Sequence, residues 1–133
     1  MTDWTVLFVC VGNAGKSVMA QALLQHSSAV GITALSAGTN AKHAVNPLTA
    51  EALSEIGIDV SSHTPRQLTD ELLSAADLVV VLGSTAQVDA DAVIWDTDEP
   101  SLRGIDGIER MRLIRDDIAG RVAELSESIS DRS

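Results

Sequence analysis

A short apolar strand that runs directly into a glycine-containing turn and then a helix is the strongest constraint on how this chain folds. Residues 5–9 (TVLFV) form a β-branched and aromatic run, which predicts a strand buried on both faces. The run breaks at residues 10–15 (CVGNAG), and apolar residues then recur at helical spacing from Lys16 to about Ser28. A strand, a tight loop and a helix in this order form the building unit of a parallel α/β sheet.

Three further strands are predicted along the chain. They are expected at residues 32–35, 77–82 and 93–95, and the second of these contains the most hydrophobic run in the sequence. Strands that alternate with helical segments predict an α/β fold with a parallel sheet. No repeat or long linker interrupts the pattern, so residues 1–133 are expected to form a single domain.

Two later helices are predicted from their end signals and their periodicity. Asn46 is placed to cap a helix that begins at Pro47, and Gly57 is placed to end it. The last helix carries an apolar stripe from Ile108 to Leu125. The arginines on its opposite face are expected to be solvated.

The charge balance excludes several classes of function. The chain has 9 Lys and Arg residues against 19 Asp and Glu residues, which gives a formal net charge of -10. Such an acidic chain offers no electrostatic surface to nucleic acid or to an anionic membrane, so neither is expected as a partner. No run reaches the roughly 18 apolar residues of a membrane helix, and the N-terminus lacks the basic region of a signal peptide. A cytoplasmic protein is therefore expected.

Cys10 is the only cysteine of the sequence. One cysteine excludes an internal disulfide and a cysteine-rich metal cluster, and a free thiol is typical of the reducing cytoplasm. His26 and His43 show no metal-ligand spacing, so no metal is expected. The chemistry of this chain is therefore expected to centre on one thiol.

The turn that holds this cysteine is suited to bind a tetrahedral oxyanion. Its two glycines allow the backbone to direct several N–H groups inward, and the following helix adds the positive end of its dipole. A cation and a helix N-terminus also stabilise a thiolate, so Cys10 is the expected nucleophile. The expected oxyanion-binding residues are Val11, Gly12, Asn13, Ala14, Gly15, Lys16 and Ser17.

Two other interpretations of the turn carry less weight. Cys10 could be an inert buried residue, but it lies at the mouth of a glycine-bearing turn. Residues 15–17 (GKS) match the end of the nucleotide-binding pattern G-x-x-x-x-G-K-S, yet cysteine occupies the place of its first glycine. In addition, Asp77 precedes its apolar strand and does not follow it, so it is not placed to hold magnesium.

Residues 6–17 (VLFVCVGNAGKS) resemble the active-site loop of the low-molecular-weight protein tyrosine phosphatase superfamily. This superfamily also contains the thioredoxin-linked and the mycothiol-linked arsenate reductases. Residues 36–39 (SAGT), residues 57–63 (GIDVSSH) and the pair Glu99-Pro100 follow the order of the family. The resemblance implies a four-stranded parallel sheet flanked by helices.

Lys16 stands where the loop of the family usually ends in arginine. Arginine clamps a tetrahedral anion through two parallel hydrogen bonds, whereas lysine acts as a point charge. Efficient hydrolysis of phosphate esters is therefore not expected. A lysine in this position is similar to the loop of the mycothiol-dependent arsenate transferases, and the resemblance implies catalytic roles for Cys10 and Lys16.

The cysteine count gives an independent argument about the redox partner. Thioredoxin-linked arsenate reductases collect the oxidising equivalents on a second and third cysteine, but residues 82–89, where one is expected, contain none. Any reduction must therefore end on an external thiol, whereas a phosphatase needs no second cysteine, so the count excludes only the thioredoxin-linked branch. The resemblance implies mycothiol as that co-substrate and a mycoredoxin as the later reductant.

The resemblance also implies a general acid directly before Pro100, where the chain has Glu99 with Asp98 beside it. Either carboxyl could protonate a leaving oxygen, and the alignment with the proline favours Glu99. The phosphatases of the family usually flank the cleft with tyrosines, and this chain has none. Trp95, the aromatic residue near this loop, is expected to pack in the core.

These observations favour an arsenate reductase of the thiol-transferase type. It would form an arsenate–mycothiol adduct through the Cys10 thiolate, for later reduction by a mycoredoxin, and would so detoxify arsenate. The alternative is a low-molecular-weight phosphatase that hydrolyses phosphate monoesters through a cysteinyl-phosphate. A third hypothesis is an oxyanion-binding module that has lost turnover.

Overall fold

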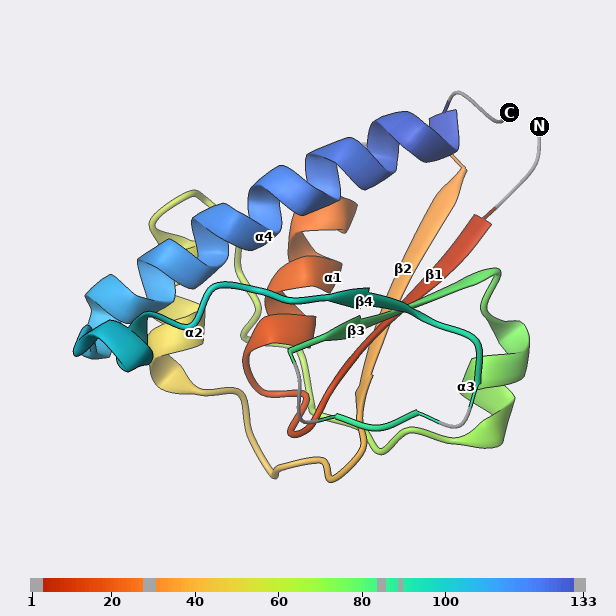
Figure 1. Cartoon of the computed structure of the whole chain (residues 1–133), viewed down its shortest axis with the longest axis horizontal. Helices are drawn as coiled ribbons and strands as arrows, with labels where there is room; N and C mark the ends of the chain where they lie inside the picture. Colours follow the sequence, from red (N-terminus) through yellow and green to blue (C-terminus); the bar gives the residue numbers. More distant parts are fainter. Residues whose placement is uncertain (1–3, 28–30, 84–85, 89, 131–133) are drawn as a thin grey trace.

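The strands form one parallel sheet in the computed structural model, which describes residues 4–27, 31–83, 86–88 and 90–130 (Figure 1). Its strands are β1 (Trp4–Cys10), β2 (Ile32–Gly38), β3 (Leu78–Leu82) and β4 (Val93–Trp95), in the order β2-β1-β3-β4. The predicted four-stranded parallel sheet is confirmed. β1 and β2 are longer than predicted because their ladder continues until Cys10 pairs with Gly38.

Four α-helices and one short 3₁₀-helix accompany the sheet in the described part of the chain. They are α1 (Lys16–His26), α2 (Pro47–Ser54), α3 (Asp70–Ala75), η1 (Pro100–Arg103) and α4 (Gly107–Ser130). The two short ones, α3 and η1, were not expected from the sequence. A helix of four to six residues is too short to show a helical period.

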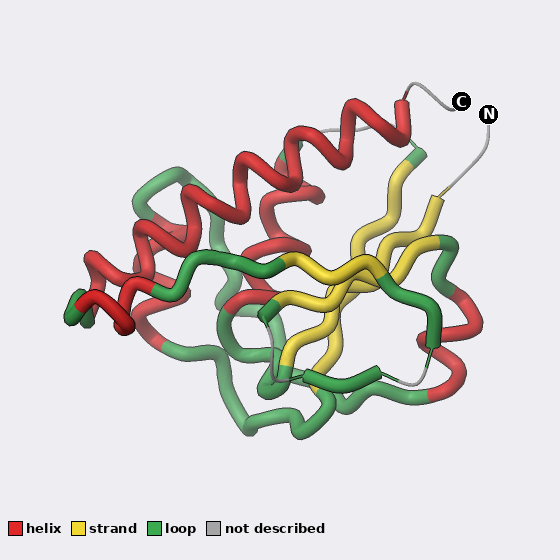
Figure 2. Tube along the Cα trace, viewed as in Figure 1, coloured by secondary structure: helices red, strands yellow, loops and turns green. Residues whose placement is uncertain are grey.

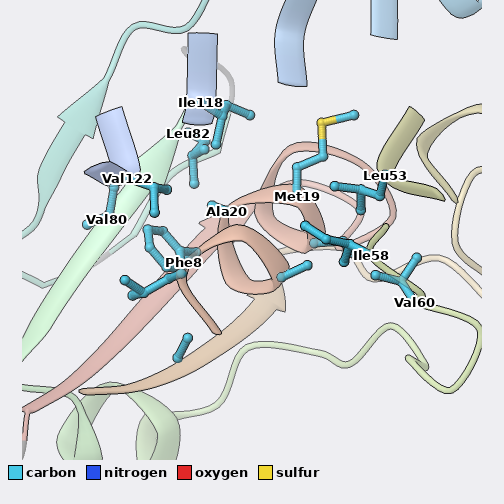
Figure 3. Packing of buried hydrophobic residues seen from close by; sticks show 14 of the residues in the cluster. Phe8, Met19, Ala20, Leu53, Ile58, Val60, Val80, Leu82, Ile118 and Val122 are labelled. Atoms are coloured by element: carbon cyan, nitrogen blue, oxygen red, sulfur yellow. The ribbon is translucent and has the colours of Figure 1, made fainter. Parts of the chain in front are cut away.

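The side chains of β1 alternate between two apolar layers. Val6 and Phe8 pack with residues of α1, α2 and α4, and Leu7 and Val9 pack with residues of α3 and its flanking segments. All four of these side chains are fully buried, as expected for a parallel strand covered on both faces. Figure 3 shows the larger layer, in which Phe8 lies beside Val80 and Val122.

The predicted end signals of α2 are confirmed. The Asn46 side chain accepts a hydrogen bond of 2.9 Å from the Leu48 N–H, and Pro47 occupies the first turn of the helix. Gly57 follows the helix with a φ of +82°, a left-handed conformation that favours glycine. Trp95 packs as expected, with its ring centroid 5.7 Å from that of Phe8.

The arginine face of α4 differs from the prediction, because only part of it is solvated. Arg115 is 9% exposed, and its guanidinium donates to the Ala52 carbonyl at 2.8 Å and to Glu55 at 2.9 Å. Arg112 also donates to Glu55, so the two arginines tie α4 to the end of α2. The apolar stripe predicted the buried face of the helix correctly but could not show which arginines find partners.

Parallel strands bring the carboxyl ends of β1 and β2 to the same edge of the sheet. The loops that follow them lie side by side there (Figure 2), and the Thr39 and Asn40 N–H groups donate to the Cys10 and Val11 carbonyls at 3.0 and 2.8 Å. Ligands of open α/β sheets bind at this edge. None of the helices in the described ranges is long and apolar enough to cross a membrane.

Candidate active site

The loop between β1 and α1 turns its carbonyls outward. The Cys10, Val11, Gly12 and Ala14 carbonyls accept hydrogen bonds of 2.8–3.0 Å from N–H groups in the segment after β2, residues 39–46. In a planar trans peptide the next N–H points opposite to its carbonyl. The N–H groups of residues 11, 12, 13 and 15 therefore point away from that segment, toward a concave surface that can receive an anion.

Gly38 allows this loop to lie directly against β2. A Cβ atom placed on Gly38 would lie 2.6 Å from the Val11 carbonyl oxygen and 2.9 Å from the Asn13 nitrogen. Those contacts are shorter than real Cβ atoms make, and both involve backbone atoms that cannot turn aside. The segment SAGT follows the order of the family by resemblance, and its glycine provides the space that the loop occupies.

Asn13 lies beneath the loop and holds it. Its side chain is fully buried, and its φ of +49° places it in the left-handed region that asparagine tolerates. The amide oxygen accepts the Arg66 N–H at 3.0 Å and lies 3.1 Å from Nε2 of His63. Because a backbone N–H can only donate, it fixes the orientation of the amide and turns its nitrogen toward Ser17, at 2.8 Å.

Ser17 is a direct hydrogen-bond partner of Cys10. Its Oγ lies 2.9 Å from Sγ of Cys10, and it accepts a hydrogen bond from the Asn13 amide. A thiolate can only accept, so Ser17 is the donor of this hydrogen bond when Cys10 is ionised. A hydroxyl that donates to sulfur stabilises the thiolate, which is the reactive form of cysteine.

His63 supports this arrangement from the opposite side of Asn13. Burial is the main cause that lowers the pKa of His63 below its usual 6.5, and the nearby Arg66 charge lowers it further. The imidazole is therefore neutral near neutral pH, with Nε2–H as the tautomer that donates to Asn13. Sequence reasoning did not reveal this contact, because 50 residues separate the two side chains.

A cavity of about 930 Å³ opens above the loop. Cys10, Val11, Gly12, Ala14, Gly15 and Lys16 line it, and so does Glu99, so the structure brings these predicted residues together. Asn13 and Ser17 lie below it, fully buried. The lining also contains Lys42, Arg103 and Arg110, so 4 of the 9 basic residues of this acidic chain lie there, together with the carboxylates of Asp96, Asp98 and Glu99.

Lys42 reaches the cavity from the loop after β2. Its aliphatic carbons lie 3.2–3.3 Å from the position that a Cβ on Gly12 would take, so its stem crosses the mouth of the loop. Sequence reasoning did not reveal this residue, because a single exposed lysine in a loop has no pattern. Its position adds a positive charge beside the anion-binding surface.

Glu99 lies in the cavity as a carboxylate between two cations. Its Oε1 is 3.5 Å from Nζ of Lys16, and Arg110 donates to both carboxylate oxygens, at 2.9 and 3.0 Å. The Ser101 hydroxyl donates to Oε2 at 2.9 Å. The Arg110 hydrogen bonds are the main cause that lowers the pKa of Glu99 to about 2, with smaller contributions from Ser101 and the Lys16 charge.

Asp98, the other carboxyl considered as a proton donor, is also ionised in this arrangement. Arg103 donates to both of its oxygens, at 2.7 and 3.1 Å, and these hydrogen bonds are the main cause that lowers its pKa. Neither Asp98 nor Glu99 thus carries a proton to donate at neutral pH. The general-acid role expected of Glu99 stays a prediction.

Arg110 is the residue of the cavity that sequence reasoning missed most clearly. It was expected on the solvated face of the last helix, but it reaches the acidic loop and holds Glu99. Its neighbour Met111 belongs to the buried stripe and also lines the cavity, so Arg110 lies at the border of the buried face. The sequence signal that could have revealed Arg110 is its place directly beside the apolar stripe of the last helix.

Comparisons with known proteins agree with this geometry. Residues 5–98 match the family described as low molecular weight phosphotyrosine protein phosphatase. A putative arsenate reductase of Halobacterium salinarum is 34% identical over 134 residues, covering 92% of this chain and 91% of that protein. A probable low molecular weight protein-tyrosine-phosphatase of Ralstonia solanacearum, EpsP, is 39% identical over 90 residues, covering 66% of this chain and 61% of that protein.

A similar solved structure is the thioredoxin-dependent arsenate reductase Cg_ArsC1′ of Corynebacterium glutamicum. It matches with a TM-score of 0.80 and 34% identity over 99% of this chain. This chain spans 64% of the length of that structure. The likeness covers the whole sheet and the loop that holds Cys10, but not the remaining part of the longer chain.

Proposed function

Because this chain belongs to the low molecular weight phosphotyrosine protein phosphatase family, we propose that it uses the catalytic thiolate of that fold on arsenate. It acts as an arsenate reductase of the thiol-transferase type. Cys10 is the nucleophile, and residues 11–17 with Lys16 bind the oxyanion. The observation that carries this proposal is the lone Cys10 thiol, 2.9 Å from the Ser17 hydroxyl, in an anion-binding loop.

The first chemical step joins sulfur to arsenic. The Cys10 thiolate attacks arsenate held by the loop N–H groups, an As–O bond breaks, and the oxygen leaves as water or hydroxide. The donors of the loop stabilise the charge that gathers on the remaining oxygens. The product is a cysteinyl-arsenate, still in the oxidation state As(V).

The second step passes arsenic to an external thiol, for which we propose mycothiol. Its sulfur attacks the cysteinyl-arsenate, the Cys10 thiolate leaves, and a soluble thiol–arsenate adduct forms. A mycoredoxin then reduces that adduct to As(III). Two facts support an external thiol: the chain contains 1 cysteine, and the cavity of about 930 Å³ is of the size that binds small organic molecules.

The thioredoxin-dependent reduction named for this similar structure does not fit the sequence of this chain. Reduction by thioredoxin ends on a protein disulfide, and a chain with 1 cysteine cannot form one internally. The similar structure is also longer than this chain, which spans 64% of it. We therefore propose a mycothiol-linked route and not a thioredoxin-linked one for this chain.

The second candidate is a phosphatase that acts through a cysteinyl-phosphate. The 39% identity with the probable tyrosine phosphatase EpsP favours it, and the loop would hold phosphate as it holds arsenate. Against it stand Lys16, which cannot clamp a phosphate bidentately, and the absence of tyrosine from the sequence.

One experiment separates these functions. The protein is incubated with arsenate, mycothiol and a mycoredoxin system, and in parallel with an aryl phosphate, with Cys10→Ser as the control. We expect arsenate consumption that requires both mycothiol and Cys10, with little ester hydrolysis. Ester hydrolysis without arsenate turnover would establish the phosphatase, and oxyanion binding without either reaction would leave a binding module.

A further inference from the structure

The carboxylate of Glu99 occupies the centre of a small charged network at the wall of the cavity. Lys16 approaches it from α1, Arg110 from α4 and Ser101 from η1. Glu99 itself stands at the start of η1, so three elements meet at one carboxylate. Its side chain is 29% exposed, which leaves it within reach of a ligand in the cavity.

Arg110 holds Glu99 in a fixed orientation. Nε and Nη2 of the guanidinium each donate to a different carboxylate oxygen, at 2.9 and 3.0 Å, which is the bidentate geometry in which arginine pairs are strongest. A carboxylate held by both oxygens cannot turn its plane without breaking a hydrogen bond. Its remaining contact, to Nζ of Lys16 at 3.5 Å, therefore has a defined direction.

Lys16 also lies beside Gly83, the residue that follows β3. Its Nζ lies 3.6 Å from the position that a Cβ on Gly83 would take, and Gly83 has a φ of +89°. The ammonium thus lies above a glycine and beside Glu99. A flexible lysine stem has few other restraints at the first position of a helix, so these neighbours decide where its charge lies.

We propose that Glu99 and Arg110 are a positioning pair for Lys16, in which Glu99 acts as a fixed counter-charge and not as the proton donor. The pair directs the Lys16 ammonium and offsets part of the positive charge of the cavity. This inference rests on the proposed function only in taking an oxyanion at the Cys10 loop as the substrate. The family resemblance implies a different role for the Glu99 carboxyl, that of the general acid.

The first step of the proposed reaction balances without a protein acid. A thiolate and dihydrogen arsenate give a cysteinyl-arsenate dianion and water, because both protons of the water come from arsenate. The S–As bond forms as one As–O bond breaks, and the net charge of -2 is the same on both sides. An alkyl phosphate monoester carries no proton on its ester oxygen, so it would have to expel an alkoxide. With Glu99 acting as a counter-charge, the site therefore favours inorganic oxyacids over alkyl phosphate monoesters.

The test uses three variants and inorganic phosphate as the probe. Glu99→Gln removes the counter-charge, Arg110→Gln removes one cation, and Asp116→Asn is the matched control. Asp116 is an arginine-paired carboxylate on α4 that does not line the cavity. Phosphate affinity is measured by calorimetry, and kcat is measured with arsenate and mycothiol or, if arsenate is not turned over, with an aryl phosphate.

We expect the two variants of the pair to move phosphate affinity in opposite directions. The loss of a partly exposed charge beside the anion is expected to change the dissociation constant for phosphate about three- to tenfold. Glu99→Gln is expected to bind phosphate more tightly, Arg110→Gln more weakly, and Asp116→Asn as the wild type. A general loosening of the site would weaken binding in both variants of the pair.

The kcat of Glu99→Gln decides between the two roles of the carboxyl. A positioning role predicts a decrease of less than about tenfold, whereas the loss of a general acid costs roughly 10²–10⁴-fold. A decrease of a hundredfold or more, or a phosphate affinity that does not rise, would overturn the proposal. The phosphate measurement needs no turnover, so a failure of the proposed function would leave this test intact.

Discussion

Ser17 is the side chain in hydrogen-bond contact with Cys10 at the level of single residues. A backbone N–H that can only donate orients the Asn13 amide, the amide donates to Ser17, and the Ser17 hydroxyl is the donor to Cys10 when the cysteine is a thiolate. The hydrogen bond is thus directed by a chain of partners that ends on Arg66. Its effect on Cys10 can be measured by alkylation, without any knowledge of the substrate.

Ser17→Ala is expected to slow the alkylation of Cys10 by iodoacetamide at neutral pH, because the thiolate loses its hydrogen-bond donor. A hydrogen bond to a charged group contributes ~1.5–3 kcal/mol. Ser54→Ala, which removes an exposed hydroxyl from α2, serves as the control. An unchanged alkylation rate in Ser17→Ala would show that this hydroxyl does not stabilise the thiolate.

Lys16→Ala is expected to weaken phosphate binding and also to slow the alkylation of Cys10 by iodoacetamide at neutral pH. The ammonium is a full positive charge at the cavity wall, and its removal disfavours both the bound anion and the thiolate. Isothermal titration with phosphate and iodoacetamide kinetics measure the two effects. If neither changed, the role assigned to Lys16 would be wrong.

The residues of the Cys10 loop could be predicted from sequence because they are neighbours in the chain as well as in the structure. Residues 10–17 are consecutive, and one strand, one turn and one helix place them. Arg110 and His63 could not be predicted in this way. Their contacts join residues 11 and 50 positions apart, so they depend on where separate elements pack.

The strands could be predicted at the level of elements because parallel strands buried on both faces leave continuous apolar runs. β3 and β4 were predicted at their observed positions, apart from Asp77, which precedes β3. The loop also depends on the element beside it. A Cβ added to Gly38, at the end of β2, would lie 2.6 Å from the Val11 carbonyl oxygen, so β2 and the loop tolerate no side chain there.

Gly38→Ala is expected to abolish phosphate binding or weaken it more than tenfold, because the added methyl group displaces the loop that directs the N–H groups inward. Gly120→Ala is the matched control. Gly120 lies inside α4 with nothing within 4 Å of an added Cβ, so alanine is expected to stabilise that helix by about 1 kcal/mol. Phosphate affinity equal to wild type in Gly38→Ala would contradict the tight fit of the loop.

At the scale of the whole molecule, Glu55 links α2 to α4 by ion pairs that add to the apolar packing between these two helices. Glu55 pairs with Arg112 and Arg115, and the Arg112 hydrogen bond is the main cause that lowers the pKa of Glu55 to about 2. A pKa below its unfolded value means that the ion pairs stabilise the fold fully above the ordinary value of 4.5. That contribution is lost as the pH falls toward 2.

The free energy of unfolding is therefore expected to decrease as the pH falls from about 4.5 to about 2. Urea denaturation at a series of pH values measures it. Glu55→Gln is expected to be less stable at neutral pH and to show a shallower decrease, because it has no carboxylate to protonate there. A variant with the same slope as the wild type would show that Glu55 does not contribute to the acid sensitivity.

The net charge of -10 affects how an anion reaches the cavity. The proposed anionic substrate must approach an acidic protein, so attraction has to come from the cavity, where Lys16, Lys42, Arg103 and Arg110 outnumber the carboxylates of Asp96, Asp98 and Glu99. The sequence predicted a local positive pocket from Lys16 and the loop alone. The other three cations come from separate elements, and only the packing of those elements brings them together.

The central claim is that Cys10 transfers arsenic to an external thiol, and the most direct test is to look for the transferred product. The protein is incubated with arsenate and mycothiol, without a redoxin, and the small-molecule fraction is analysed by mass spectrometry. We predict a mycothiol–arsenate adduct that accumulates with the wild-type protein and is absent with Cys10→Ser. No adduct with the wild type, or the same amount with Cys10→Ser, would contradict the claim.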